Sequence, residues 1–241
     1  MDGYAIEFPP APGAAPQDEL AAVTFPDGHR ELLRLHDYER IFAVPGLYEE
    51  IVQHRLQCRS PDQVAAMLAG AASRLGWAPG DVRVLDVGAG NGVSGEALAA
   101  RGLRPVVALD ILPAARTATL RDRPGLYDVC LTADLLALDD ELREAIGALA
   151  PNALTVVGAV GSGHLPPAAF RAAADLLAND ALIVFTTPAD VDDPDAEGVR
   201  AMAALTAPDA VELGRERYRH RLTTSGDSRW WEAVALHVSA R

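Results

Sequence analysis

Three glycines at alternate positions, Gly88, Gly90 and Gly92, have the spacing in this chain that most clearly indicates a ligand site. They follow a mostly apolar run at 82–87 and precede an Ala- and Leu-rich segment at 93–101. This order predicts a strand, a tight turn and a helix. Because glycine has no Cβ, the backbone of such a turn can adopt positive φ and come close to a ligand. Free N–H groups at the start of the helix would lie beside it, so the turn predicts a site for a polar ligand.

Two kinds of nucleotide ligand are compatible with a turn of this type. The dinucleotide fingerprint requires G-x-G-x-x-G directly after the strand. Counting from Gly88, the third glycine position is Val93, and a match that starts at Gly90 begins two residues too late. The chain therefore fits NAD less well. Asp86 places a carboxylate at the end of an apolar strand, which is unfavourable unless donors or a cation pair with it, and this favours a ligand with an amino group.

The segment 85–92, LDVGAGNG, resembles the glycine-rich motif of class I S-adenosylmethionine (SAM) methyltransferases. In that family the loop backbone lies against the methionyl part of SAM, and the acid helps to position its amino group. The resemblance implies that Asp86, Gly88, Ala89 and Gly90 bind SAM and that the fold is Rossmann-like.

Two further acidic residues stand where this family contacts SAM. Asp110 closes a predicted strand at 105–110, and a carboxylate there accepts hydrogen bonds from two ribose hydroxyls in NAD-binding and SAM-binding folds alike. By resemblance, Asp134 would accept a hydrogen bond from the adenine amine, and the Leu135 backbone N–H would reach a ring nitrogen. Ile111 would lie against one adenine face. A single aspartate at a strand end is more often a helix N-cap, but three acids in register with a glycine turn favour one shared ligand.

The loop at 160–167, after the fourth predicted strand, contains the candidate catalytic residues. Ligands of open α/β sheets bind outside the carboxyl ends of the strands, so this loop would face the methyl group of SAM. His164 is the imidazole in the loop, and it would either take a proton from a hydroxyl or amine nucleophile or fix the loop before the next helix. Ser162 would orient the substrate or satisfy the turn. Methyl transfer from a sulfonium needs little acid or base help, so positioning could supply most of the rate.

The elements that position these residues predict an α/β fold with a doubly wound, mostly parallel, seven-stranded sheet. Segments 218–223 and 230–239 are predicted to form a β-hairpin through 225–228, and the last strand is expected to insert antiparallel, as it does in this methyltransferase class. The other predicted elements are strands at 128–132, 152–159 and 181–187 and helices at 113–122, 139–150, 167–178 and 197–205.

The part of the chain before the glycine turn is predicted to divide into a tail and a lid. Residues 1–27, Pro- and Ala-rich at 8–16, are expected to be extended or disordered. Residues 28–80 are expected to form an N-terminal helical lid, and 81–241 the SAM-binding domain. The lid helices are predicted at 31–42, 47–58 and 60–75.

Three polar residues of the predicted lid have specific roles assigned to them. Ser60 is the expected N-cap of the third helix, with Pro61 at its first position. Tyr38 and Tyr48 have polar tips, and Tyr38 is the predicted cofactor contact; packing of the lid onto the core is the alternative for both.

Composition restricts the partners of this protein. Its formal net charge is −13, from 34 acidic and 21 basic residues. Because Lys and Arg supply most non-specific affinity for nucleic acid, we expect a small-molecule substrate and no nucleic acid. The sequence has no apolar stretch of about eighteen residues and no N-terminal signal, so a cytoplasmic protein without membrane contact is expected.

The remaining residues with metal-binding or catalytic potential are given structural roles. Cys58 and Cys130 form no disulfide framework and no metal spacing, so buried thiols and no metal are expected. Surface or packing roles are assigned to the other histidines, namely His29, His36, His54, His220 and His237.

The predicted function is a SAM-dependent methyltransferase that transfers a methyl group directly to a small acceptor, of the small bacterial metabolite or natural-product type. One alternative keeps SAM but performs other chemistry, such as intramolecular cyclisation of SAM. A second is an NAD-dependent oxidoreductase, disfavoured by Val93 and Asp86. A third is a non-catalytic scaffold of the same fold, which would expose a large apolar patch.

Overall fold

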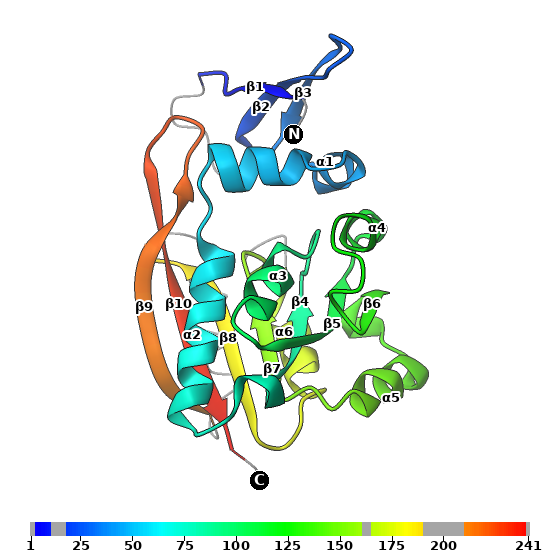
Figure 1. Ribbon diagram of the computed structural model, residues 1–241, viewed down its shortest axis with the longest axis vertical. Coiled ribbons are helices and arrows are strands. Elements are labelled where there is room, and N and C mark those ends of the chain that lie inside the picture. Colours follow the sequence, from blue (N-terminus) through cyan, green and yellow to red (C-terminus); the bar gives the residue numbers. More distant parts are fainter. Residues whose placement is uncertain (1–2, 11–17, 161–164, 190–209, 240–241) are drawn as a thin grey trace.

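The computed structural model describes residues 3–10, 18–160, 165–189 and 210–239, which form two sheets and the helices around them (Figure 1). The strands of the larger sheet are β4 (Arg83–Val87), β5 (Arg104–Asp110), β6 (Val129–Thr132), β7 (Ala153–Val156), β8 (Ala181–Pro188), β9 (Ala210–Leu222) and β10 (Ser228–Val238). Their order is β6-β5-β4-β7-β8-β10-β9. The pairs from β6 to β8 are parallel, whereas β10 runs antiparallel to both β8 and β9. The predicted seven-stranded, mostly parallel sheet with a C-terminal antiparallel hairpin is confirmed.

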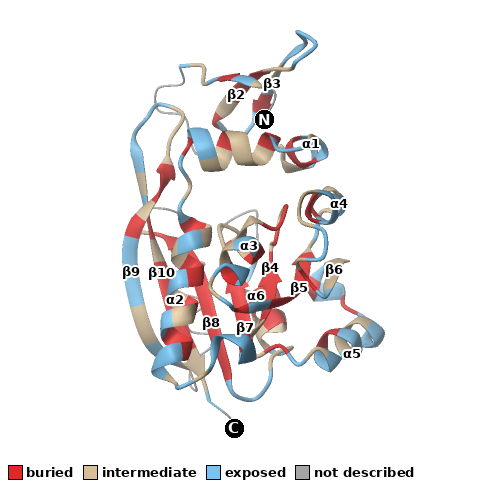
Figure 2. Ribbon diagram, in the orientation of Figure 1, coloured by how far each residue is buried: buried red, intermediate tan, exposed pale blue. Residues whose placement is uncertain are grey.

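Helices cover both faces of this sheet because residues along a strand alternate between its two sides. On β4, Val84 packs in a cluster with Leu68 and Leu98, whereas Leu85 packs with Ile146 and Phe170 on the other face. Figure 2 shows that buried residues concentrate on the central strands. The helices of the two faces and the connections are α2 (Ser60–Arg74), η3 (Pro79–Asp81), α3 (Val93–Ala99), α4 (Pro113–Asp122), η4 (Leu135–Ala137), α5 (Asp140–Ala148) and α6 (Pro167–Ala174).

The helix starts follow local signals in the sequence. Pro61, Pro113 and Pro167 each occupy the first turn of a helix, where the missing N–H is not needed. Asp139 caps α5 by accepting a hydrogen bond from the Leu142 N–H at 2.8 Å. The predicted helix at 197–205 lies outside the described residues. No helix in the described ranges is long and apolar enough to cross a membrane.

The N-terminal layer differs from the predicted tail and helical lid. It contains an antiparallel sheet of β1 (Ala5–Glu7), β2 (Leu20–Thr24) and β3 (Arg30–Arg34), followed by helix α1 (Tyr38–Ala43) and the π-helical segment η2 (Glu49–Arg55). The expected helix at 31–42 is therefore wrong in its first half. Gly28, at φ +85°, closes a hairpin between β2 and β3, and burial then alternates, with Leu33 and Leu35 inside and Leu32 outside.

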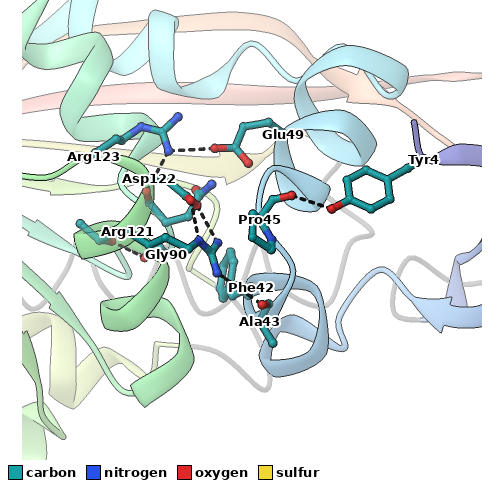
Figure 3. A network of polar contacts seen from close by, with 11 residues as sticks. Tyr4, Phe42, Ala43, Pro45, Glu49, Gly90, Arg121, Asp122 and Arg123 are labelled. Atoms are coloured by element: carbon teal, nitrogen blue, oxygen red, sulfur yellow. Dashed lines mark hydrogen bonds and ion pairs between the residues drawn. The ribbon is translucent and has the colours of Figure 1, made fainter. Parts of the chain in front are cut away.

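This N-terminal layer lies over the carboxyl ends of the parallel strands (Figure 1). Helix α1 packs on α4 through Phe42, which contacts Ala115 and Ala118. Two arginines at the end of α4 extend this contact, as Figure 3 shows. Arg121 Nη1 donates to the Phe42 carbonyl at 3.1 Å, and Arg123 Nη1 forms an ion pair with Glu49 of η2 at 2.8 Å. The layer is thereby held against the glycine turn.

Candidate active site

A cavity of about 900 Å³ lies between the N-terminal layer and the carboxyl ends of the strands. Its walls include the glycine turn after β4 and the residues that follow β5, β6 and β7. The opposite walls come from α1, η2, the start of α2 and the β9–β10 hairpin. Segments distant in the sequence therefore form one binding space.

The glycine turn has the geometry of a close-contact ligand cradle. Gly88 and Gly90 have φ of +69° and +56°, the left-handed region that favours glycine. A Cβ on Gly88 would lie 2.6 Å from the Ala159 Cβ, and one on Gly90 would lie 3.2 Å from Phe42. No side chain fits at Gly88 without movement of its surroundings, so the turn exposes backbone to the cavity.

Asp110 joins the glycine turn to the end of β5. Its Oδ2 accepts the Gly90 N–H and its Oδ1 accepts the Leu112 N–H, both at 2.9 Å. Burial raises the pKa of this carboxyl, and these two bonds oppose the rise. Next to it, Ile111 lines the cavity with 63% of its surface exposed, so its apolar side chain is accessible to a ligand.

Asp134 caps a helix and also lies at the cavity. Its Oδ1 accepts the Leu136 N–H at 2.9 Å, so it caps η4, and the residue also lines the cavity together with Leu135. The structure thus brings eight of the proposed SAM residues to one cavity: Gly88, Ala89, Gly90, Asp110, Ile111, Asp134, Leu135 and Tyr38.

Asp86 does not join this group, contrary to its expected role at the SAM amino group. Its side chain is 1% exposed and it is not among the described residues that line the cavity. Its carboxylate instead accepts hydrogen bonds from the Tyr127 hydroxyl at 2.7 Å and the Thr155 hydroxyl at 2.8 Å. The donors that a buried carboxylate requires therefore come from the protein, and Asp86 supports the strand beneath the glycine turn.

We expect the free energy of unfolding to depend on pH through the protonation of Asp86. Burial raises its pKa from 3.8 to about 6, against the two hydrogen bonds from Tyr127 and Thr155 and with a smaller contribution from the charge of Asp110. Because the folded state then binds the proton more tightly than the unfolded state, this group adds stability as pH falls from about 7 towards 4. The difference between the pKa of Asp86 in the folded and in the unfolded state corresponds to about 3 kcal/mol in the free energy of unfolding, at about 1.4 kcal/mol per pH unit.

Urea unfolding of the wild type and of Asp86→Asn, measured between pH 8 and pH 4, isolates this contribution. The free energy of unfolding of the wild type relative to the variant should rise as pH falls. A constant difference across this range would show that Asp86 has an ordinary pKa in the folded protein.

The remaining predicted site residues divide between the cavity and the part of the chain not described. Tyr38 lines the cavity, and its ring stacks on Phe42 with centroids 5.8 Å apart. Burial raises its pKa to about 12, so the phenol stays protonated at neutral pH. His164 and Ser162, the predicted catalytic residues, lie outside the described residues, and their roles stay predictions.

The hairpin end of the cavity contains side chains that the sequence reasoning did not place at the ligand site. His220, Arg221, Arg229 and Trp231 all line it, and the burial of His220 and its stacking on Trp231 agree with the packing role predicted for it. Ser60 is not the N-cap of α2, since that position is Arg59. Alternation along β9 was the available signal, because Tyr218 and His220 must share one face of the strand.

A central cluster at this end fixes the orientation of the imidazole. Ser60 Oγ lies 2.6 Å from both the Tyr218 hydroxyl and His220 Nδ1. The His220 ring stacks on Trp231 with centroids 4.0 Å apart. Cys58 Sγ lies 3.9 Å from His220 Nδ1, and burial raises the pKa of its thiol. The cluster is therefore uncharged at neutral pH, since burial and then the charges of two arginines hold the pKa of His220 well below 6.5.

The strand order, the antiparallel last strand and the glycine turn beneath a roofed cavity define a class I methyltransferase fold. A family model described as a methyltransferase domain matches residues 48–233. The chain belongs to this family, and it is a SAM-dependent methyltransferase. No curated protein matches the chain.

Solved structures agree with this fold. The chain is similar to the 1,6-didemethyltoxoflavin-N1-methyltransferase of Burkholderia thailandensis, solved with 1,6-didemethyltoxoflavin and S-adenosylhomocysteine, with 15% identity and a TM-score of 0.54 over 97% of this chain and 99% of that one. It is also similar to a proposed RNA methyltransferase of Pyrococcus horikoshii, with 14% identity and a TM-score of 0.53 over 76% and 86% of the two chains. At such identities both likenesses show the fold alone.

The residues of the cavity fit SAM. Gly88 and Gly90 line the cavity without side chains, so the methionyl part of SAM could come close to the backbone there. Asp110 supplies a carboxylate for ribose hydroxyls, and the exposed side chain of Ile111 offers an apolar surface for a base.

Proposed function

We propose that this methyltransferase acts on a small-molecule acceptor that binds in the hairpin end of the cavity, beside the SAM residues. The observation that supports this most strongly is one cavity beneath the N-terminal layer whose two ends differ chemically. The glycine turn and Asp110 lie at one end, and residues of the β9–β10 hairpin lie at the other. Its volume of about 900 Å³ lies near the top of the range of about 300–1,000 Å³ for small-molecule sites. It therefore has room for SAM and a second molecule.

The charge of the chain argues against RNA as the acceptor. With a net charge of −13, the protein would repel a polyphosphate backbone instead of neutralising it with Lys and Arg. The N-terminal layer also covers the carboxyl ends of the strands, where a base would have to enter.

The proposed chemistry depends mainly on positioning. When bound, SAM supplies a methyl group on a sulfonium, and the electrons of the broken C–S bond leave with the neutral sulfur. Asp110, Asp134 and the glycine turn would fix the nucleoside and the methionyl part at one end. The N-terminal layer would exclude water and hold the acceptor atom in line with the C–S bond that breaks. Such positioning contributes much of the acceleration in reactions of this kind. His164 and Ser162 are proposed to assist proton removal and acceptor orientation.

Mass spectrometry of reaction mixtures tests this function. The protein is incubated with methyl-labelled SAM and separate panels of phenols, heteroaromatic amines, carboxylic acids and structured RNA, with Asp110→Ala as the control for specific SAM use. Label should appear in a small molecule and not in RNA. Label in RNA alone would overturn the proposal, and so would a cyclised or cleaved SAM product formed without any acceptor.

A further inference from the structure

Charged side chains of both signs surround the cavity. They include Asp37, Glu39 and Asp110 as well as Arg40, Arg221 and Arg229. Arg221 is in turn ion-paired with the carboxylate of Glu19. These charges do not favour one sign of acceptor, so an uncharged hydrogen-bonding group is better suited to discriminate between acceptor molecules.

His220 is an uncharged group of this kind, and one side of its ring is held by the protein. Ser60 Oγ lies 2.6 Å and Cys58 Sγ lies 3.9 Å from Nδ1. Burial raises the pKa of the Cys58 thiol, so this thiol, like the Ser60 hydroxyl, keeps a hydrogen that it can donate. Burial, followed by the charges of Arg221 and Arg229, holds the pKa of His220 well below 6.5. The imidazole is therefore neutral at pH 7, and one of its nitrogens carries no hydrogen.

A chain of hydroxyls behind His220 favours Nδ1 as the nitrogen without a hydrogen. Thr186 Oγ1 accepts the Gly158 N–H at 2.9 Å and is hydrogen-bonded to Tyr218, whose hydroxyl lies 2.6 Å from Ser60 Oγ. If Thr186 donates to Tyr218, Tyr218 to Ser60 and Ser60 to Nδ1, each hydroxyl donates once and accepts once. In the reverse direction, the hydrogen of the Thr186 hydroxyl would have no acceptor among these groups. Nε2 therefore carries the ring hydrogen.

The Nε2 side of the His220 ring opens on the cavity. Nε2 makes no hydrogen bond within the described ranges of the chain. Nor is it enclosed by protein, in contrast to Nε1 of Trp231, the indole on which the imidazole stacks with centroids 4.0 Å apart. Because His220 lines the cavity, Nε2 offers its hydrogen to a molecule at the hairpin end. The stacking on Trp231 and the contact with Ser60 fix the direction of this donor.

We infer that His220 selects the acceptor molecule: its Nε2–H donates a hydrogen bond to a carbonyl oxygen of a neutral, planar acceptor at the hairpin end. A carbonyl oxygen suits the site because it only accepts, and Nε2–H only donates. The aromatic side chains of the cavity, which include Tyr38, Tyr48 and Trp231, suit a planar molecule. This inference rests on the proposed function, because it names the substrate class of the same site. His220 gives up no proton in the reaction; it orients the carbonyl and, with it, the atom that receives the methyl group.

Nuclear magnetic resonance of the full chain tests which nitrogen of His220 carries the hydrogen. The protein contains isotope-labelled histidine and is saturated with S-adenosylhomocysteine, and the His220 signals are those that disappear in His220→Gln. At pH 7 the hydrogen should be on Nε2, and Nδ1 should carry none. A hydrogen on Nδ1 would overturn the inference, because Nε2 would then accept hydrogen bonds instead of donating them.

Titration with 1-indanone and with indane, followed by the same signals, tests the substrate class without turnover. The two probes are flat bicyclic molecules that differ only in one carbonyl group. 1-Indanone should shift the signal of the Nε2 hydrogen. The affinity for 1-indanone relative to that for indane should fall about tenfold in His220→Phe, which keeps an aromatic ring against Trp231 but leaves the bound carbonyl without its donor. His220→Gln, whose amide N–H can replace the Nε2–H, should reduce this ratio by less than about threefold.

His237→Phe is the matched control, because it makes the same substitution on β10, at a residue that pairs with Asp180 and is not among the described residues that line the cavity. It should leave the affinity ratio unchanged. An equal fall in His237→Phe, or an unchanged ratio in folded His220→Phe, would overturn the inference. Absence of a 1-indanone shift at His220 in the wild type would do the same, whether or not the variants fold. If 1-indanone binds through His220 but no small acceptor is labelled by SAM, the proposed function fails and the carbonyl subsite stands.

Discussion

Replacing Gly95 with alanine is expected to lower the free energy of unfolding by about 3 kcal/mol, within the range typical of overpacked cores and broken buried hydrogen bonds. Gly95 lies in α3, and a Cβ there would be 2.1 Å from the Tyr127 hydroxyl oxygen and 2.3 Å from its Cζ. The ring of Tyr127 is 7% exposed and has little space to retreat. Its displacement would also break the 2.7 Å bond to Asp86, which leaves a buried carboxylate with fewer donors.

Chemical denaturation at pH 7 measures this effect, with Gly147→Ala in α5 as the matched control. Both glycines are helical and neither has a positive φ, but a Cβ on Gly147 would meet nothing within 4 Å. The control should be neutral or stabilising by up to about 1 kcal/mol, because alanine has the higher helix propensity. Equal stability of the two variants would show that Tyr127 does not occupy the space above Gly95.

Asp110→Ala should weaken SAM binding about 100-fold, the second large effect. In its proposed role the carboxylate would accept hydrogen bonds from two ribose hydroxyls, and hydrogen bonds to charged groups contribute about 1.5–3 kcal/mol each. A loss of about 3 kcal/mol corresponds to about 100-fold in affinity. The substitution also releases the Gly90 N–H, which Asp110 Oδ2 accepts at 2.9 Å, so the glycine turn would lose an anchor.

Isothermal titration with SAM and with S-adenosylhomocysteine measures the affinity. Asp128→Ala is the matched control, because this aspartate precedes β6 with about half of its side chain exposed and only a 3.9 Å contact to Arg104. The control should bind within about twofold of the wild type, as exposed ion pairs contribute little. SAM binding by Asp110→Ala at wild-type strength would remove the assigned ribose site, provided that thermal unfolding shows a folded variant.

The central sheet could be predicted because its signals are local. Strands such as β5 and β8 are continuous apolar runs bounded by Gly, Pro or Asp, and buried parallel strands have this pattern. The acids at 110 and 134 end such runs, so their place at one edge follows from the topology. The glycine turn could be predicted from its own spacing, and Gly88, Gly90, Asp110 and Asp134 all line one cavity.

The side-chain contacts that could not be predicted join distant parts of the chain. Asp86 binds Tyr127 and Thr155, which are 41 and 69 positions away, and no local pattern indicates that its donors come from the protein. His220 Nδ1 is hydrogen-bonded to Ser60 Oγ across 160 positions, and no local pattern indicates this contact either. The N-terminal sheet was missed because its strands are short and Leu32 and Leu33 are adjacent, which blurs the alternation.

The contact between Glu19 and Arg221 also has a consequence for how the chain is made on the ribosome. Glu19 directly precedes β2 in the N-terminal layer. Its carboxylate is bound by Arg221 and by the Thr224 N–H, about 200 positions later in the chain. Translation adds residues in order, at about 5–20 per second. Glu19 is therefore synthesised at least about ten seconds before Arg221 and Thr224. During that interval strands β4 to β8 can pair, but the N-terminal layer lacks its contact with the β9–β10 hairpin. A nascent chain should therefore first bind SAM productively only after this hairpin has emerged.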